Sequence, residues 1–315
     1  MQTSKLLLTG ANGFVGKGLM KRIRAEGAAV CAVVRGETVP PGCVRGPALG
    51  AAARWAPLLA GCDAVVHAAA RVHVMNETAH DPLTAFREVN VAGTLNLARQ
   101  AAEAGVRRFV FISSIKVNGE ATASGRAFTS ADTPAPMDAY AISKAEAEAG
   151  LTSLAAETGM EVVIVRPPLI YGPGVKANFL RMMRWLKRGI PLPLGAILHN
   201  RRSLVALDNL ADLIVSCIDH PAAANQVFLA SDGEDVSTTD LLRRLAAAMG
   251  VPARLLPVPV RVLETCATLL GKRALMQRLC TNLQVDISKA RQLLGWRPPI
   301  SLNEGLRRTV AGTIA

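Results

Sequence analysis

A tyrosine and a lysine four residues apart are the residues of this sequence best suited to acid–base chemistry. Tyr140 and Lys144 stand in the segment YAISK, and a spacing of four places both on one helix face. A free tyrosine has a pKa of about 10, too high for a base near neutrality, and lowering it by about 3 units requires about 4 kcal/mol. A nearby ammonium can contribute to that stabilisation. The pair is suited to exchanging a proton with an alcohol, although an ordinary exposed Tyr–Lys pair is equally compatible with this spacing alone.

A glycine-rich turn near the amino end has the pattern of a phosphate-binding loop. The apolar run 5–9 predicts a buried strand, TGANGFVG follows it, and 17–23 predicts a helix. The three glycines allow a sharp turn, a close approach of a pyrophosphate, and close packing of the helix on the strand. Phosphates bind to the free N–H groups at such a helix start. The residues expected to contact a dinucleotide here are Gly10, Asn12, Gly13, Phe14, Val15 and Gly16.

Strands and helices alternate along the first half of the chain. Apolar runs predict strands over 30–34, 64–67, 109–113 and 162–166, and helices are expected over 83–104 and 139–157. This alternation predicts an α/β fold, a Rossmann-like, doubly wound parallel sheet. After Pro167 the pattern loosens, and helices dominate from residue 237 onward. We therefore expect residues 1–170 and about 203–230 to form a dinucleotide-binding domain. Residues 171–202 and 231–315 would form a smaller, mostly helical substrate domain.

Composition favours a cytoplasmic enzyme. Half of the 315 residues are hydrophobic, but no apolar stretch reaches the roughly 18–20 residues that span a bilayer, and we expect neither membrane insertion nor a signal peptide. The six cysteines form no CxxC motif and the five histidines no metal-ligand spacing. The net charge of +12 is scattered, and aromatic residues make up only 4%. We expect no nucleic-acid partner, but a basic surface that attracts anionic ligands.

The GxxGxxG and YxxxK patterns together resemble the short-chain dehydrogenase/reductase superfamily. The form TGANGFVG is similar to its extended branch, the NAD(P)-dependent nucleotide-sugar epimerases, dehydratases and reductases. This resemblance implies that Tyr140 and Lys144 are catalytic, with the phenolate stabilised by Lys144 and by an oxidised nicotinamide. In the segment FISSIKVNG it places the third catalytic group, a hydroxyl, at Ser114, with Ser113 nearer the cofactor.

Further marks of this branch cover nearly the whole chain. The resemblance implies further cofactor contacts from segments that follow two expected strands and from one residue on an expected helix; these are Ala68, Ala69, Ala70, Pro167 and Asn90. It also implies three contacts to the diphosphate of a UDP-sugar substrate, Asn178, Arg202 and Arg278. Family members pair helices corresponding to 83–104 and 139–157, which implies a homodimer.

Two departures from the family pattern bear on the reaction. Enzymes that use NAD usually carry an acid after the second strand, whereas Val34 and Arg35 stand there. An arginine accommodates a 2′-phosphate, so NADP is favoured and NAD stays open. Dehydratases carry Asp-Glu after the catalytic hydroxyl, whereas this chain has Ile115 and Lys116. Without that carboxylate pair, a 4,6-dehydration is not expected.

Two reactions at carbon 4 of the sugar remain. Segments such as RVHVM resemble a subgroup often named UDP-glucose 4-epimerase, which also contains 4-keto reductases that make 6-deoxy-N-acetylhexosamines for bacterial surface polysaccharide. Arg35 favours the reductase, because NADPH is the usual cellular reductant, and the 4-epimerase is the alternative. A non-catalytic NADP-binding regulator or RNA-binding protein is a further alternative, although the chain retains the serine, tyrosine and lysine.

Overall fold

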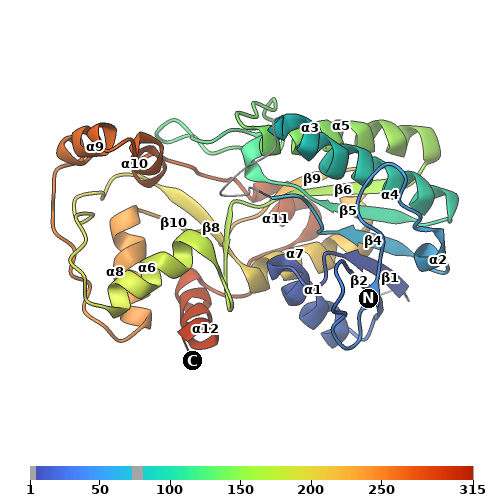
Figure 1. The fold of residues 1–315 in the computed structure, drawn as a ribbon, viewed down its shortest axis with the longest axis horizontal. Coiled ribbons are helices and arrows are strands. Elements are labelled where there is room, and N and C mark those ends of the chain that lie inside the picture. Colours follow the sequence, from blue (N-terminus) through green and yellow to red (C-terminus); the bar gives the residue numbers. More distant parts are fainter. Residues whose placement is uncertain (1–4, 73–80, 315) are drawn as a thin grey trace.

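A seven-stranded parallel sheet forms the larger part of the molecule (Figure 1). The computed structural model describes residues 5–72 and 81–314, without the side chains of 177, 178, 274, 275 and 314. The strand order β3-β2-β1-β4-β5-β6-β9 reverses between β1 and β4, which is where open α/β sheets bind ligands. The strands are β1 (Lys5–Thr9), β2 (Ala29–Val34), β3 (Val44–Arg45), β4 (Ala64–His67), β5 (Arg108–Ile112), β6 (Glu161–Arg166) and β9 (Val227–Leu229).

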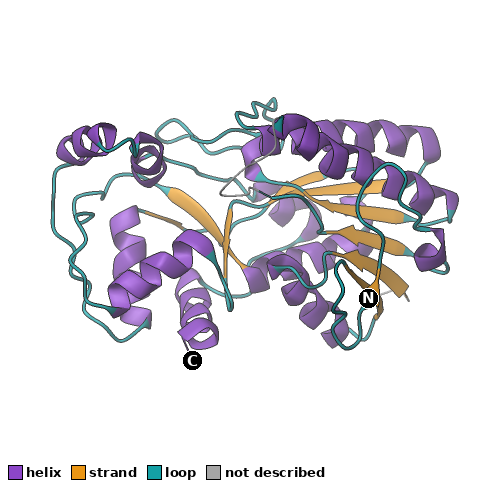
Figure 2. Cartoon of the chain, viewed as in Figure 1, coloured by secondary structure: helices purple, strands orange, loops and turns teal. Residues whose placement is uncertain are grey.

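Helices cover both faces of this sheet, so three layers are visible (Figure 2). One face carries α1 (Phe14–Ala25) and α7 (Leu207–Asp219); the other carries α4 (Gly93–Glu103) and α5 (Ala139–Thr158). Because both faces are covered, every residue of β4 and β5 is buried, which explains the apolar runs 64–66 and 109–112. The fold expected from the sequence is confirmed. The remaining helices of this part are α2 (Ala56–Leu59), α3 (Pro82–Arg87) and α11 (Ser288–Leu294).

The helix expected over 83–104 is not a regular α-helix throughout. A π-helical turn, η1 (Glu88–Ala92), separates α3 from α4, and such turns are frequent at functional sites. By contrast, the helix expected over 139–157 is observed as α5 with clear ends. The Asp138 side chain accepts a hydrogen bond from the Ala141 N–H at 2.7 Å, and Gly159 ends the helix in the left-handed conformation at φ +75°.

A smaller region with its own sheet and helices lies beside the large sheet (Figure 1). Its strands pair in the order β10-β8-β7, with β7 parallel and β10 antiparallel to β8. Its elements are β7 (Leu169–Tyr171), β8 (Arg202–Ala206), β10 (Asp235–Val236), α6 (Ala177–Lys187), α8 (Thr238–Ala248), α9 (Val260–Leu269), α10 (Arg273–Cys280) and α12 (Leu302–Ile314). A separate apolar core of these elements surrounds Phe179 and Leu242. The division into two domains at the boundaries given above stays a prediction.

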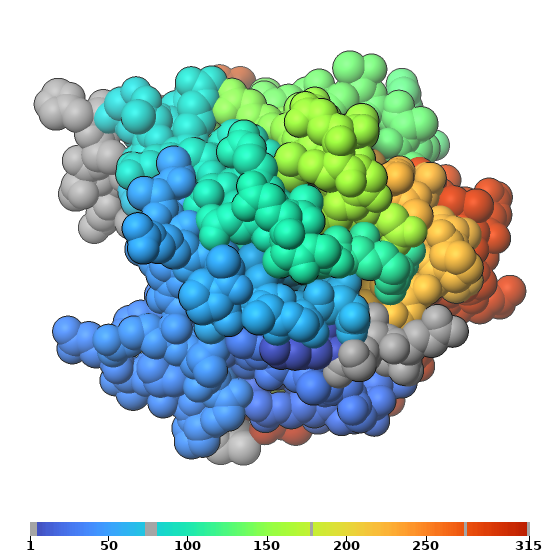
Figure 3. Space-filling view, turned by 90° about the vertical axis from the view of Figure 1, so that its right-hand side faces the viewer, coloured from blue at the N-terminus to red at the C-terminus, as the bar shows by residue number. Residues whose placement is uncertain are grey.

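Viewed from the end of the large sheet, the surface consists mainly of residues from the first half of the chain (Figure 3). Among the described residues, no helix combines the length and apolarity needed to cross a membrane. In the same part of the chain, no three His, Cys, Asp or Glu side chains are grouped to hold a metal ion. The six cysteines are unpaired. His73 and His80 lie outside the described residues.

Candidate active site

The glycine turn connects β1 to α1 and packs against the segment that follows β4. Gly10 has φ +70°, and a Cβ there would lie 2.8 Å from the Ala69 backbone nitrogen. At Gly16 a Cβ would lie 2.1 Å from the Gly10 carbonyl oxygen. Larger residues at these two positions would therefore displace backbone rather than a flexible side chain. The turn brings Ala68, Ala69 and Ala70 to the same edge of the sheet as the start of α1.

The amino end of α1 is suited to bind an anion. Gly13 is the N-cap, no side chain caps the helix, and the first turn contains no acidic residue. Asn12 and Gly13 are exposed, and Phe14 and Val15 are half-buried. The first backbone N–H groups of a helix attract phosphate through hydrogen bonding and the helix dipole. A side chain at Gly10 or Gly16 would clash with backbone, so the turn stays open. These residues therefore fit the pyrophosphate of a dinucleotide. Arg35 is exposed directly after β2.

His67 is a structural residue beneath this turn. It is fully buried at the end of β4, between the hydroxyl oxygens of Thr9 at 2.7 Å and Thr94 at 3.0 Å. Burial, with a smaller effect of the Lys144 charge, lowers its pKa from 6.5 to about 3. The imidazole is therefore neutral and exchanges no proton near pH 7. The sequence did not indicate its two threonine partners, because only the fold brings Thr9, His67 and Thr94 together.

Asn90 joins two segments of the site. Its side chain accepts a hydrogen bond from the Arg71 N–H at 2.8 Å and donates to the Arg71 carbonyl and to Ser143 Oγ, both at 3.0 Å. Ser143 Oγ donates in turn to the Tyr140 carbonyl at 2.7 Å. Asn90 is buried within η1. It therefore positions the chain after β4 against the first turn of α5, and all its hydrogen bonds in this structure are internal.

The two serines and Lys144 meet at the carboxyl end of β5. Lys144 Nζ, on α5, donates to the Ile112 carbonyl at 2.7 Å and lies 4.3 Å from the centre of the Phe111 ring. Ser113 and Ser114 follow this strand, and the N–H of Ile115 donates to the carbonyl of Pro167 at 3.0 Å. The loop after β5 thus lies beside the loop after β6. These contacts bring the expected residues of both loops and of α5 to one edge of the sheet.

The hydroxyl of Ser113 is buried and has no hydrogen-bond partner among the described residues. A buried hydroxyl without a partner costs about 1–3 kcal/mol, so this atom fits a bound polar group. Ser114 is half-buried at the start of the short helix η2 (Ile115–Val117). Its Oγ accepts the N–H of Lys116 at 3.3 Å and retains further hydrogen-bonding capacity. The roles expected from the sequence, Ser113 toward the cofactor and Ser114 toward the substrate, stay predictions.

The surroundings of Tyr140 disfavour its phenolate form. Burial, with a smaller contribution from the Asp138 carboxylate, raises the pKa of Tyr140 from 10 to about 12. Burial lowers the pKa of Lys144 from 10.5 to about 7, against a smaller opposite effect of Glu148. The sequence argument expected a lowered tyrosine pKa. That expectation included an oxidised nicotinamide; in the chain without a cofactor, desolvation of the phenolate and the Asp138 charge both raise the pKa of Tyr140.

Asp138 and Lys116 form an ion pair at the start of α5. Lys116 Nζ pairs with the Asp138 carboxylate and, at 3.0 Å, with Glu120. Asp138 also caps α5 two residues before Tyr140. Lys116, the residue at the position of a dehydratase carboxylate, therefore holds the loop after β5 against α5. The sequence pointed to Lys116 only by its departure from the family pattern, and its partner, 22 residues away, became visible only in the fold.

Two arginines of the smaller region lie close enough to affect one another. Burial and the charge of Arg278, on α10, lower the pKa of Arg202, which begins β8. Arg202 donates to the Thr281 carbonyl at 3.1 Å, and no ion pair of either arginine is present among the described residues. Two adjacent guanidinium groups without a carboxylate suit a diphosphate. Asn178 lies near the start of α6, but its side chain is outside the described part.

A buried ion pair fixes α5 on the sheet. Glu148, one turn after Lys144, pairs with Arg166 at the end of β6, and Arg166 also donates to Asn118 Oδ1 at 2.9 Å. Replacing Glu148 with Gln leaves a buried guanidinium charge, which should lower the free energy of unfolding by about 3 kcal/mol or more. Urea denaturation measures this change.

The neighbouring Glu146 supplies the control, because it pairs with Arg87 at the surface of the same helix. Glu146→Gln should cost at most about 1 kcal/mol. Equal losses for the two variants would contradict a structural role of the buried pair.

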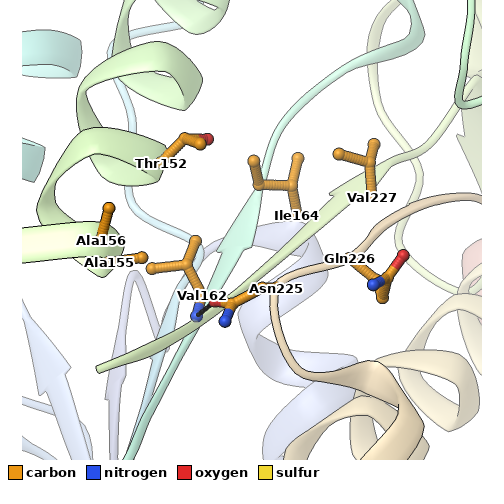
Figure 4. Close-up of a pocket in the computed structure, with 8 residues that line it drawn as sticks. All are labelled: Thr152, Ala155, Ala156, Val162, Ile164, Asn225, Gln226 and Val227. Carbon is orange, nitrogen blue, oxygen red and sulfur yellow. Dashed lines mark hydrogen bonds between the residues drawn. The ribbon is translucent and has the colours of Figure 1, made fainter. Parts of the chain in front are cut away.

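A cavity elsewhere on α5 is unrelated to these residues (Figure 4). It measures about 280 Å³ and lies between the second half of α5, β6 and β9. Its lining residues are Thr152, Ala155, Ala156, Val162, Ile164, Asn225, Gln226 and Val227. At about 1.5 Å of rise per residue, Thr152 lies about 18 Å along the helix from Tyr140.

Sequence comparison assigns the chain to a known family. The NAD dependent epimerase/dehydratase family matches residues 6–230. The chain belongs to this family. It is also 50% identical over 307 residues to a UDP-glucose 4-epimerase of Vibrio cholerae, covering 96% of this chain and 94% of the relative. It is therefore an NAD(P)-dependent enzyme of the epimerase/dehydratase family, and the resemblance inferred from its motifs is confirmed.

Solved structures of similar fold include one with a UDP-sugar bound and one with NADPH bound. A UDP-glucose 4-epimerase of Thermotoga maritima with UDP-glucose has a TM-score of 0.77 at 21% identity, covering 98% of each chain. The RMD protein of Pseudomonas aeruginosa with NADPH has a TM-score of 0.74 at 23% identity, also covering 98% of each chain. At these identities the likeness establishes a common epimerase/dehydratase fold.

Proposed function

We propose that this enzyme reduces the 4-keto group of a UDP-sugar at the expense of NADPH, with a 4-keto-6-deoxy-N-acetylhexosamine as substrate. The observation that carries this proposal is Arg35, exposed directly after β2, where enzymes that use NAD usually have an acid. The pKa of Tyr140, raised to about 12 in the cofactor-free chain, agrees with a tyrosine that begins the reaction protonated. A tyrosine that holds its proton can donate it to a ketone oxygen, whereas oxidation of an alcohol needs the phenolate. The cofactor, when bound, supplies the hydride to carbon 4. The proton from Tyr140 completes the alcohol.

The neighbouring residues have distinct roles in this proposal. The half-buried hydroxyl of Ser114 binds the oxygen at carbon 4, and the buried Ser113 hydroxyl contacts the cofactor. Lys144, linked to the Ile112 carbonyl at 2.7 Å, orients the cofactor ribose. Arg202 and Arg278 hold the diphosphate. Lys116 takes the place of a dehydratase carboxylate and pairs with Asp138, which argues against removal of water from the sugar.

Arg35 supports NADPH as the reductant. Because it is exposed after β2 at the ribose end of the expected cofactor, it can form charge-assisted hydrogen bonds to a 2′-phosphate. Such bonds contribute about 1.5–3 kcal/mol. Arg35→Ser should therefore raise the KM for NADPH by roughly 10- to 100-fold and change the KM for NADH little. Arg24→Ser, at another exposed arginine of this region, is the matched control. Steady-state kinetics with both cofactors would contradict the proposal if Arg35→Ser affected NADH and NADPH equally.

A UDP-sugar 4-epimerase is the second candidate, because the Vibrio cholerae relative carries that name. The two reactions differ in cofactor balance. We expect one NADPH oxidised for each molecule of UDP-4-keto-6-deoxy-N-acetylhexosamine converted. Conversion of UDP-glucose or UDP-N-acetylglucosamine to its 4-epimer without net NADPH oxidation would replace the reductase by the epimerase. Product analysis by nuclear magnetic resonance, with cofactor absorbance recorded in the same reaction, distinguishes them.

We also propose a homodimer in which α4 and α5 face the same helices of a second copy. The two helices lie side by side on one face of the sheet (Figure 1). A cytoplasmic location and a role in making bacterial surface polysaccharide belong to the same proposal. Light scattering measures the mass of the particle, and a monomer would contradict the dimer.

A further inference from the structure

Helix α9 carries an exposed apolar stripe. Val262, Cys266 and Leu269 are spaced by four and three residues, which places them on one face of the helix. Leu269 is 82% exposed, the next residue Leu270 is 70% exposed and Val262 is 50% exposed. The opposite face is already occupied, because Ala267 and Leu263 pack against Ile197 and Met276. The stripe is therefore not a displaced part of the core.

The surroundings of the stripe are basic. Lys272 and Arg273, directly after it, are exposed, and the whole segment 265–280 contains no Asp or Glu. The same bias holds elsewhere in the smaller region. Residues 169–206, from β7 to β8, contain seven Lys and Arg and no Asp or Glu. Among the charged side chains of α9 itself, Arg261 and Glu264 are both exposed and offset one another.

The position in the fold leaves this surface accessible. Helices α9 and α10 lie at the end of the molecule farthest from the seven-stranded sheet (Figure 1). They pack on each other through the small cluster around Met276. Arg278, one of the two diphosphate arginines, is on α10 and is exposed. A partner bound at the apolar stripe of α9 would therefore lie near Arg278 of the expected substrate site. It would not cover the glycine turn between β1 and α1.

We propose that the α9–α10 surface docks the enzyme on an anionic phospholipid membrane. An apolar stripe flanked by basic residues is the pattern of a helix that lies in the interface between headgroups and acyl chains. Leu269, Leu270 and Val262 enter the interface, and Lys272 and Arg273 contact acidic headgroups. A second copy of the chain suits the surface less well, because two basic faces repel each other. A nucleic acid would leave the leucines without an apolar partner.

The test is sedimentation of the full-length enzyme with phospholipid vesicles. We expect it to partition to vesicles of phosphatidylcholine with about one third phosphatidylglycerol, and roughly 25-fold less to pure phosphatidylcholine, because about fivefold is expected from each of the two basic residues, Lys272 and Arg273. Raised salt should weaken the binding. The double substitution Leu269→Glu with Leu270→Glu should reduce partitioning about tenfold or more.

Matched variants keep the outcome clear. Leu293→Glu changes another exposed leucine, on α11, and should leave partitioning unchanged. Turnover of a soluble UDP-sugar should be the same for the wild type and for the Leu269→Glu, Leu270→Glu variant, because neither leucine belongs to the active site. Equal binding to neutral and anionic vesicles, or full binding by the leucine variant, would overturn the proposal. The proposal would also fail if substitution of the leucines changed the particle mass measured by light scattering but left vesicle binding intact. That result would assign the stripe to contact with a second copy of the chain.

Discussion

Tyr140→Phe is expected to lower kcat by about 10³-fold, within the range of roughly 10²–10⁴ for general acid catalysis. The phenolic proton is the feature that the variant removes. Phenylalanine keeps the edge-on packing against Phe86, whose ring centre lies 6.1 Å away. The KM for the sugar and the dissociation constant of the cofactor should therefore change little. Steady-state kinetics and cofactor titration by fluorescence measure the two effects separately.

The second tyrosine of the chain is the control for this variant. Tyr171 is buried, and its hydroxyl donates to Asp232 at 2.6 Å. Tyr171→Phe should lower the free energy of unfolding by about 1–3 kcal/mol, because it leaves buried acceptors without a donor, but it should keep kcat. If Tyr140→Phe retained more than about a tenth of the wild-type kcat, another residue would have to supply the proton.

Lys144→Met should lower kcat by about 10²-fold or more. It removes the buried ammonium that lies on the same helix face as Tyr140, one turn further along α5. At the same time the variant should be as stable as the wild type, or more stable, at neutral pH. Burial already lowers the pKa of Lys144 to about 7, which means that the folded chain holds this charge at a cost. An activity loss combined with a retained free energy of unfolding indicates a functional rather than a structural lysine.

The pH dependence of this stability difference follows from the same shift. Between about pH 7 and the ordinary value of 10.5, the unfolded chain binds the lysine proton and the folded chain does not. The stability of the wild type therefore rises with pH through that window. The methionine variant lacks this contribution, so its advantage should be largest below pH 7 and should shrink toward pH 10.5. Urea denaturation at several pH values tests it, and an advantage that grows with pH would contradict the assignment.

Much of the fold could be predicted because the strands are short apolar runs with clear boundaries. Residues 64–67 are both predicted and observed as a strand, and Gly10 marks the turn because its φ of +70° suits glycine. The π-helical turn at Asn90 could not be predicted, because its sequence continues the periodicity of the flanking helices. The two-residue strands Val44–Arg45 and Asp235–Val236 are too short to leave a pattern.

In the candidate site, too, some residues could be predicted from the sequence and others only from the fold. Tyr140, Lys144 and the serines carry a spacing that can be seen in the sequence. The pairs Lys116–Asp138 and Glu148–Arg166 depend on contacts between separate elements, and so does the Thr9–His67–Thr94 cluster. The lowered tyrosine pKa that the sequence predicts with an oxidised nicotinamide bound stays a prediction. The raised pKa of the cofactor-free chain comes mainly from desolvation, which the spacing does not show.

The central claim is that Tyr140 holds its proton until the ketone takes it. The most direct test is titration of the phenol by its near-ultraviolet absorbance in the cofactor-free enzyme, with Tyr140→Phe as the blank. The chain has only two tyrosines, and burial beside Asp232 raises the pKa of Tyr171 far above its ordinary value. We expect no phenolate from Tyr140 until the pH approaches about 12. A one-tyrosine transition near or below about pH 8 that disappears in Tyr140→Phe would show a resting phenolate and contradict the claim.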